Sequence, residues 1–327
     1  DRLVGFGSTP VILFSARGGL KGTWSKQLDR HAHDSASDFL QHIENPNVTE
    51  EWLARDGLHR EILGLWWRCK FPDGLKRRVL QSISNTYPSQ HKLHQWGLRP
   101  SPDCTSCRGY DPAPLCTQGH IQGRCDGTKE ARIKAHHALR KVISEAIGRK
   151  CKKWRQYPET SLGSLRPLIE KATGICVPDL PPFRYTDPDT GKTRSVRWDV
   201  SSTWRPDETL ISCSYKTILT TELTRPWDRD ADYDDVQDGI KTARYLAWQS
   251  HLHSLLAPHG WRVQQCNFTV GARGSLLESR WTSHFDTLRF PTKFRAALLQ
   301  TLHETALVHL DEVFQAFRAN QRLGSAT

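Results

Sequence analysis

The sequence predicts a mixed α/β fold for its second half, preceded by a segment that a metal ion holds together. Two apolar stretches, at 207–212 and 216–224, have the pattern of neighbouring strands. A helical pattern at 233–257 leads from them to a further strand at about 261–269. Strands and helices in this succession predict a sheet that is crossed by helices. Ahead of them, Cys and His residues between 104 and 125 have the spacing of metal ligands.

Further elements complete this picture on both sides of those strands. Before them we expect a helix over 162–172 that Gly174 ends, then short strands at 183–185 and 194–200 around a turn at 187–191. One or two helices should fill 291–321, after the last strand. Earlier in the chain, short helical patterns cover 75–84 and 129–154, the second ending in a basic cluster. Pro158 should stop that second helix.

Composition and periodicity divide the 327 residues into four segments. We expect the tail of an upstream domain at 1–24, a helical linker domain at 25–99, a zinc knuckle with a basic helix at 100–157, and the α/β domain at 158–327. The linker contains Trp66 and Trp67, which suit a packed core or, as an alternative, stacking on bases. The chain contains no Met, so we interpret it as a segment of a longer polypeptide.

Charge and cysteine usage narrow the class of protein. The net charge is +11 and the pI is about 9.3, a balance that favours a polyanionic partner, although a merely basic protein would look the same. Nine cysteines, an odd number without a disulfide-like framework, suit reduced thiols in an intracellular protein. Mean hydropathy is −0.60, and no apolar run reaches the roughly 18–20 residues of a membrane span. We therefore expect a nucleic-acid partner and no membrane.

Cys104, Cys107, His120 and Cys125 form a candidate tetrahedral zinc site. Two thiolates lie on a tight turn, and a His and a Cys close the set, which leaves no position for water. The zinc would therefore be structural. Cys116 is an alternative fourth ligand, because its spacing from His120 is also feasible.

Asp207 and Glu222 are candidate ligands of a catalytic metal. One carboxylate starts a strand and the other lies near the end of the next, so a hairpin would bring both to one ion. Magnesium suits two such oxygen donors. Lys241, on the following helix, could contact the phosphate of a substrate bound at this metal. Tyr245, one helical turn further on, could hydrogen-bond the backbone. This is the layout of a metal-dependent nuclease.

Simpler interpretations remain open for each of these residues. Asp207 could cap a turn, Glu222 could pair with Arg225, and Lys241 could lie on a solvated helix face. Asp199 is a rival first acid, and Glu170 could be an additional one. The acidic run at 228–235 lacks the Gly and final Glu of a calcium loop, so we interpret it as a solvated helix start.

Five blocks in order resemble the restriction-like endonuclease domain at the C-terminus of early-branching non-LTR (LINE-type) retrotransposon proteins. They are Arg205-Pro206-Asp207, Glu222-Leu223-Thr224-Arg225-Pro226-Trp227-Asp228, Lys241 with Tyr245, Gly260-Trp261-Arg262-Val263, and Val270-Gly271 with Arg273-Gly274. The chain departs from the family in an acidic, longer stretch before Lys241 and in Arg244, where Lys is usual. The resemblance also favours Cys125 as the fourth zinc ligand.

The resemblance implies a fold and a function. The fold would be a restriction-endonuclease-like, PD-(D/E)XK-type core with a mixed sheet between helices. The function would be nicking of double-stranded target DNA in the nucleus, so that the reverse transcriptase domain upstream in the same polypeptide can prime on the nick and copy the element RNA. The lysine role, two residues after the acid in many such nucleases, would fall to Lys241, because Thr224 stands at that place.

Several basic residues are candidate nucleic-acid contacts. They are Lys76, Arg77, Arg78, His136, Arg149, Lys150, Lys152, Lys153, Arg155 and Arg273. His136 belongs to an Arg132-x3-His136-His137 pattern that resembles one following the family's knuckle, and we expect it to bind nucleic acid or support the fold. A second function is a nucleic-acid-binding module with weak or no cleavage of its own. A third is a domain with a structural role alone.

Overall fold

The computed structural model describes residues 4–6, 9–11, 68–83, 87–107, 109–186, 191–198, 204–228 and 233–324. Most of the predicted linker, including Trp66 and Trp67, lies outside these residues, as does Asp199. Near the start of the chain, β1 (Val4–Phe6) and β2 (Thr9–Val11) form an antiparallel pair.

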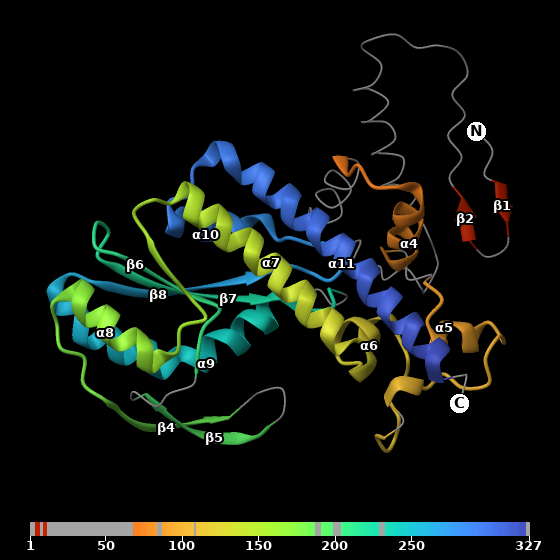
Figure 1. Ribbon diagram of the computed structural model, residues 1–327, viewed down its shortest axis with the longest axis horizontal. Coiled ribbons are helices and arrows are strands. Elements are labelled where there is room, and N and C mark those ends of the chain that lie inside the picture. Colours follow the sequence, from red (N-terminus) through yellow and green to blue (C-terminus); the bar gives the residue numbers. More distant parts are fainter. Residues whose placement is uncertain are drawn as a thin grey trace, which may run out of the picture.

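A four-stranded mixed sheet forms the centre of the molecule (Figure 1), in the order β3 (Arg155–Pro158), β6 (Glu208–Ser212), β7 (Thr217–Thr224), β8 (Arg262–Thr269). β3, β6 and β7 pair antiparallel, whereas β7 and β8 run parallel. A tight turn suffices between β6 and β7, but parallel strands need a crossover. The helix α9 (Tyr233–Leu256) supplies it.

Alternation along the strands gives the sheet two apolar faces. Leu210 and Leu219 point to one face, where α7 (Lys129–Lys150), α10 (Glu278–Leu288) and α11 (Arg295–Gly324) lie. Ile211 and Ile218 point to the other, against α8 (Leu162–Thr173) and α9. The fold is therefore a sheet between two layers of helices, a mixed α/β arrangement as predicted.

The knuckle segment packs against the last turns of α11. Its short helical pieces are η1 (Thr105–Cys107), α6 (Gln118–Gly123) and η2 (Asp126–Thr128), and two helices of the linker, α4 (Asp73–Ile83) and α5 (Gln90–Gln95), precede them. Its cysteines share an apolar cluster with Leu310, Phe314 and Phe317 of α11. The ring of Phe314 also stacks on Tyr87 at 3.7 Å. The knuckle thus shares a core with the C-terminal helix.

The predicted central elements are confirmed to within a few residues, including Gly174 as a left-handed cap of α8. The short strands form a separate pair, β4 (Leu180–Thr186) and β5 (Thr193–Trp198). α10 was not predicted. The segment assigned to the knuckle and its basic helix contributes more to the sheet than expected, because α7 covers one face and β3 begins at Arg155. No helix within the described residues is both long and apolar enough to cross a membrane.

Candidate functional sites

The β6–β7 hairpin brings Asp207 and Glu222 together. Glu208 pairs with Thr221, so the next residue on each strand, Asp207 and Glu222, lies at the same end of the hairpin. One hydrogen bond joins the two acids, and a second joins Asp207 to Leu223, the residue after Glu222. The amide of Asp207 donates to Glu222 Oε1 at 3.3 Å, and the amide of Leu223 donates to Asp207 Oδ2 at 2.7 Å. The side chain of Glu222 is 4% exposed, so its charge requires a close partner.

The helix α9 provides that partner. Lys241 Nζ lies 2.6 Å from Glu222 Oε2, and Tyr245, one helical turn further on, donates from its hydroxyl to the carbonyl of Arg205 at 3.1 Å. Burial, and then the negative charge of Glu222, raise the pKa of Tyr245 above its ordinary value, so this phenol remains a donor. All four predicted catalytic side chains therefore meet at one end of the sheet.

His136 of α7 joins the same group. Its Nε2 lies 3.2 Å from Asp207 Oδ1, although 71 residues separate the two along the chain. Burial by itself would raise the pKa of Asp207, but the hydrogen bond and positive charge of His136, with the amide of Leu223, hold it below its usual range. We expected His136 to contact nucleic acid or support the fold; the structure places it against a candidate catalytic acid.

Glu208 is a buried acid that sequence reasoning missed. It is 3% exposed and accepts hydrogen bonds from Ser144 Oγ at 3.1 Å and Gln156 Nε2 at 2.9 Å. Burial raises its pKa. Because neighbouring strand residues point to opposite sides, Glu208 joins α7 to β3 while Asp207 faces the site. In the sequence, Asp207 is distinguished by its place directly after Pro206, whereas nothing marks Glu208.

The rival acids have different outcomes. Glu170 accepts from the amide of Val177 at 2.9 Å and from Arg166 at 3.5 Å, and no hydrogen bond joins it to the acids at the end of the hairpin. The backbone bond from Val177 lowers the pKa of Glu170. Glu170 therefore stabilises the end of α8 and does not extend the site. Asp199 lies outside the described residues.

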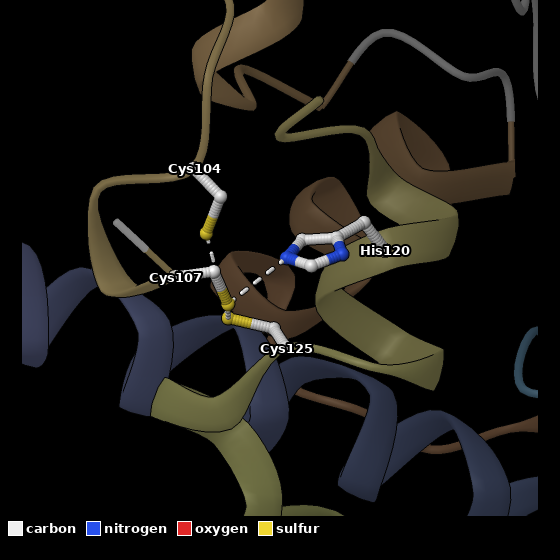
Figure 2. A group of neighbouring side chains, drawn as sticks. All are labelled: Cys104, Cys107, His120 and Cys125. Carbon is white, nitrogen blue, oxygen red and sulfur yellow. Dashed lines mark hydrogen bonds between the residues drawn. The ribbon is translucent and has the colours of Figure 1, made fainter. Parts of the chain in front are cut away.

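The four predicted zinc ligands converge as expected (Figure 2). Within the described part of the chain, Cys104, Cys107, His120 and Cys125 are the one group of three or more such side chains whose ligand atoms all lie within 4.8 Å of one another. Cys104 Sγ is 3.6 Å from Cys125 Sγ, and Cys107 Sγ is 3.5 Å from His120 Nε2 and 4.0 Å from Cys125 Sγ.

These separations fit a tetrahedral metal ion. Ligand atoms about 2.0–2.3 Å from a central zinc lie roughly 3.3–3.8 Å apart. Cys116 is not a member of the group. Its backbone instead ties the loop to its surroundings, since its amide donates to Pro102 and its carbonyl accepts from His91. The cluster can therefore hold a metal such as zinc through Cys125.

The knuckle also touches the segment that follows Glu222. Arg225 donates to Gln122 of α6 at 3.1 Å. Trp227 lies so close to Gly119 that an added Cβ would sit 3.0 Å from its ring. On α7, Arg132 donates to the carbonyl of Cys125 at 3.2 Å. The Cys/His cluster and the acids are thus joined both through α7 and through the end of β7.

Two predicted nucleic-acid contacts need correction. Arg273 is 2% exposed, and its Nε lies 3.1 Å from Asp228, itself fully buried. An added Cβ on Gly271 would lie 2.1 Å from Asp228 Oδ2, so only glycine fits beside this pair. Arg78 is bound by Asp311 at 2.5 and 2.8 Å. Both guanidinium groups therefore support the fold and are not directed at a phosphate.

The acidic run before α9 is also less solvated than expected. Asp228 pairs with Arg273, and Asp234, 3% exposed, pairs with Arg280 at 2.5 Å. Residues 229–232 lie outside the described part of the chain. At the end of α7, by contrast, Arg149, Lys150, Lys152, Lys153 and Arg155 are all exposed, and Lys76 and Arg77 on α4 are half-buried and exposed respectively. These cations remain candidates for contact with nucleic acid.

Compared with known protein families and with curated protein sequences, the chain matches none.

Proposed function

We propose that this chain is a magnesium-dependent DNA endonuclease with a restriction-endonuclease-like core. The observation that carries the proposal is the convergence of Asp207, Glu222 and Lys241 at one end of a hairpin. The amide of Asp207 donates to Glu222, the amide of Leu223 donates to Asp207, and Lys241 donates to Glu222. Two acids and a lysine at adjoining strand and helix positions match what metal-assisted phosphodiester hydrolysis requires. The five sequence blocks that resemble the retrotransposon endonuclease domain, which include these three residues, also support the proposal.

In this proposal Asp207 and Glu222 would hold the metal through carboxylate oxygens, the donors that magnesium prefers. When bound, magnesium activates water and neutralises charge on a phosphate. Lys241 would contribute a fixed positive charge to the phosphate. His136 and the amide of Leu223 would fix the orientation of Asp207, and Tyr245 would anchor α9 against the chain before β6. Zinc in the knuckle would have a structural role.

The resemblance suggests a setting for this activity. The nuclease would nick double-stranded target DNA in the nucleus, and the 3′-hydroxyl at the nick would prime a reverse transcriptase located upstream in the same polypeptide. The element RNA would be the template and a second nucleic-acid partner. The net charge of +11 is consistent with such partners.

A plasmid assay tests the activity. Wild-type protein, Asp207→Ala, Glu222→Ala and Asp199→Ala are incubated with supercoiled plasmid and magnesium, and open circles are measured. Glu170→Gln is the matched control, because this acid bonds to Arg166, Cys176 and Val177 at the end of α8. We expect the two site variants to lose nicking and Glu170→Gln to retain it. Equal nicking by wild type and both site variants would refute the proposal.

A binding module without cleavage is the second candidate. One observation favours it: each carboxylate oxygen of Asp207 and Glu222 already has a hydrogen-bond donor from the protein, so the two acids are satisfied without a metal ion. Retention of DNA in magnesium-free buffer, with no nicking in magnesium or manganese, would favour this candidate. Calorimetry with manganese separates the two further, because heat that Asp207→Ala abolishes would indicate a metal site.

A further inference from the structure

A polar pocket lies at the end of the sheet opposite the acids. Its volume is about 190 Å³. It is lined by Trp154, Tyr215, Thr217, Arg262, Asp286 and Arg289, with Gln264 and Thr287. Thr217 starts β7 and Glu222 follows five residues later, a separation of about 17 Å at the usual rise of a strand. The pocket is therefore a second site on the same sheet, apart from the acids.

The charge of the pocket is positive. Arg262 and Arg289 both line it, and within the described residues no carboxylate forms an ion pair with either. The one acid in its wall, Asp286, is bound by Arg295 at 2.6 Å. Two guanidinium groups without a counter-ion at one pocket favour an anionic ligand. Each planar guanidinium group can donate two parallel hydrogen bonds to two oxygens of one phosphate.

Contacts with the ring of Tyr215 position Arg289 and Lys153. The guanidinium of Arg289 lies 4.1 Å above the ring of Tyr215, and Lys153 Nζ lies 5.2 Å from the same ring. Trp154, 7% exposed, packs beside Tyr215 and donates from Nε1 to the carbonyl of Leu288 at 3.0 Å. Arg289 has φ 53°, a left-handed conformation that costs energy for a side chain with a Cβ. Its position is thus defined by the fold.

The pocket adjoins the basic end of α7. Lys150 Nζ lies 3.6 Å from the centre of the Phe294 ring, which joins the end of that helix to the loop after α10. Lys152, Lys153 and Arg155 follow directly and are exposed. A ligand with a single phosphate would leave these cations unused, whereas a chain of phosphates can contact them and the pocket together.

We infer that this pocket binds a phosphate of a nucleic-acid strand, with Arg262 and Arg289 as its direct contacts and the basic end of α7 as their extension. At about 3.4 Å per base pair, 17 Å corresponds to about five base pairs from the phosphate held at the acids. The inference requires nucleic-acid binding but no cleavage, so it stands or falls separately from the proposed nuclease activity.

Binding is measured by fluorescence anisotropy with a labelled DNA duplex in magnesium-free buffer over a series of salt concentrations. Arg262→Ala/Arg289→Ala is compared with Arg184→Ala/Lys171→Ala, which removes the same charge from exposed positions on β4 and α8. We expect the pocket variant to bind roughly tenfold more weakly at low salt, with the slope of log K against log salt reduced by about 1 for each arginine. The control variant should keep most of the affinity and the slope.

Two further arms keep the test decisive. Tyr215→Leu removes the surface on which Arg289 rests while leaving every charge, so we expect an intermediate loss of affinity. Inorganic phosphate at constant ionic strength should compete no better than chloride if the ligand is a strand. The inference is overturned if pocket and control variants bind alike, or if inorganic phosphate binds tightly while the pocket variant leaves duplex binding unchanged.

Discussion

His136 shows how much one side chain can add to a site that sequence patterns define incompletely. Its Nε2 is the donor nearest Asp207 Oδ1, at 3.2 Å, and both side chains are partly shielded from water. Removal of a group that orients a metal-binding carboxylate commonly lowers activity by roughly 10- to 100-fold. We therefore expect His136→Ala to lower the nicking rate about tenfold or more without unfolding the protein.

His137→Ala is the matched control, because the neighbouring imidazole is exposed on the same helix. His136→Gln should restore much of the rate, since its amide nitrogen can occupy the place of Nε2. Manganese affinity, measured by calorimetry, should fall in His136→Ala and recover in His136→Gln. Equal nicking rates for His136→Ala and His137→Ala would show that the contact with Asp207 has no positioning role.

Arg273 offers a test of stability. Removing one partner of a buried ion pair leaves an uncompensated charge, which costs about 3–5 kcal/mol. Arg273→Ala should therefore lower the free energy of unfolding by that amount in urea, because Asp228 is fully buried and would lose its cation. Arg184→Ala, at an exposed position, should change it little. A stable Arg273→Ala protein with weakened DNA binding would restore the original prediction of a nucleic-acid contact.

At this scale the sequence identified the residues that local spacing defines. Asp207, Glu222, Lys241 and Tyr245 stand at the start and end of strands and one helical turn apart, positions that pattern alone can relate. The partners of Asp228, Arg78 and His136 lie 45, 233 and 71 residues away. Such pairings depend on tertiary packing, which no local pattern records.

At the scale of elements, two buried histidines connect helices to the loops and strands beneath them. His284 of α10 contacts the carbonyl of Asn267 at 3.0 Å, and His303 of α11 contacts that of Gly274 at 2.8 Å. Burial lowers the pKa of both imidazoles below the value of about 6.5 that they have in an unfolded chain. Both are therefore neutral in the folded protein near neutral pH.

The consequence is a loss of stability in mild acid. As the pH falls through about 6.5, the unfolded chain binds protons that the folded chain does not, so the free energy of unfolding falls. Each imidazole should steepen that fall by roughly 1 kcal/mol per pH unit. Urea unfolding between neutral and mildly acidic pH measures it. His284→Gln should flatten the dependence and the exposed His253→Gln should not; equal slopes in all three proteins would contradict this account.

The elements themselves were largely predictable. Continuous apolar stretches joined by a short polar link located β6 and β7, which are buried on both faces, and helical patterns located α8 and α9. α10 was missed although Trp281 and Phe285 are buried. Its acidic and polar residues dilute a short apolar face, and its N-cap, Leu277, makes no side-chain cap bond that would mark its start.

At the scale of the whole molecule, the knuckle and the α/β domain share more than the sequence suggests. Sequence reasoning leads us to expect that loss of zinc unfolds about 100–130 and leaves the core beyond Ser161 folded. Arg225 contacts Gln122 of the knuckle, and Trp227 contacts Gly119. Arg225 and Trp227 come directly after the strand that carries Glu222, so the knuckle supports that end of the strand. We therefore expect loss of zinc from the knuckle to disturb the positions of Asp207 and Glu222.

Cys107→Ser and Cys116→Ser form a matched pair for this prediction. Metal analysis should find about one zinc per chain in wild type and in Cys116→Ser, and much less in Cys107→Ser. Nicking should fall in Cys107→Ser while circular dichroism shows most helices retained. Zinc retained in Cys107→Ser, or lost in Cys116→Ser, would refute the assignment of Cys107 and Cys125 as ligands.

The helix α7 acts as a spacer of fixed length. It starts beside the Cys/His cluster, carries His136 to the acids and ends next to the basic pocket, 22 residues in all and about 33 Å long. A helix is stiff, so the distances and angles among these three places are set by a number of residues and not by a flexible joint. Each inserted or deleted residue would turn one end by about 100° relative to the other. Over evolutionary time, or in a designed chimaera, this helix could change length only in whole turns, whereas the loops around it could change length without altering these distances.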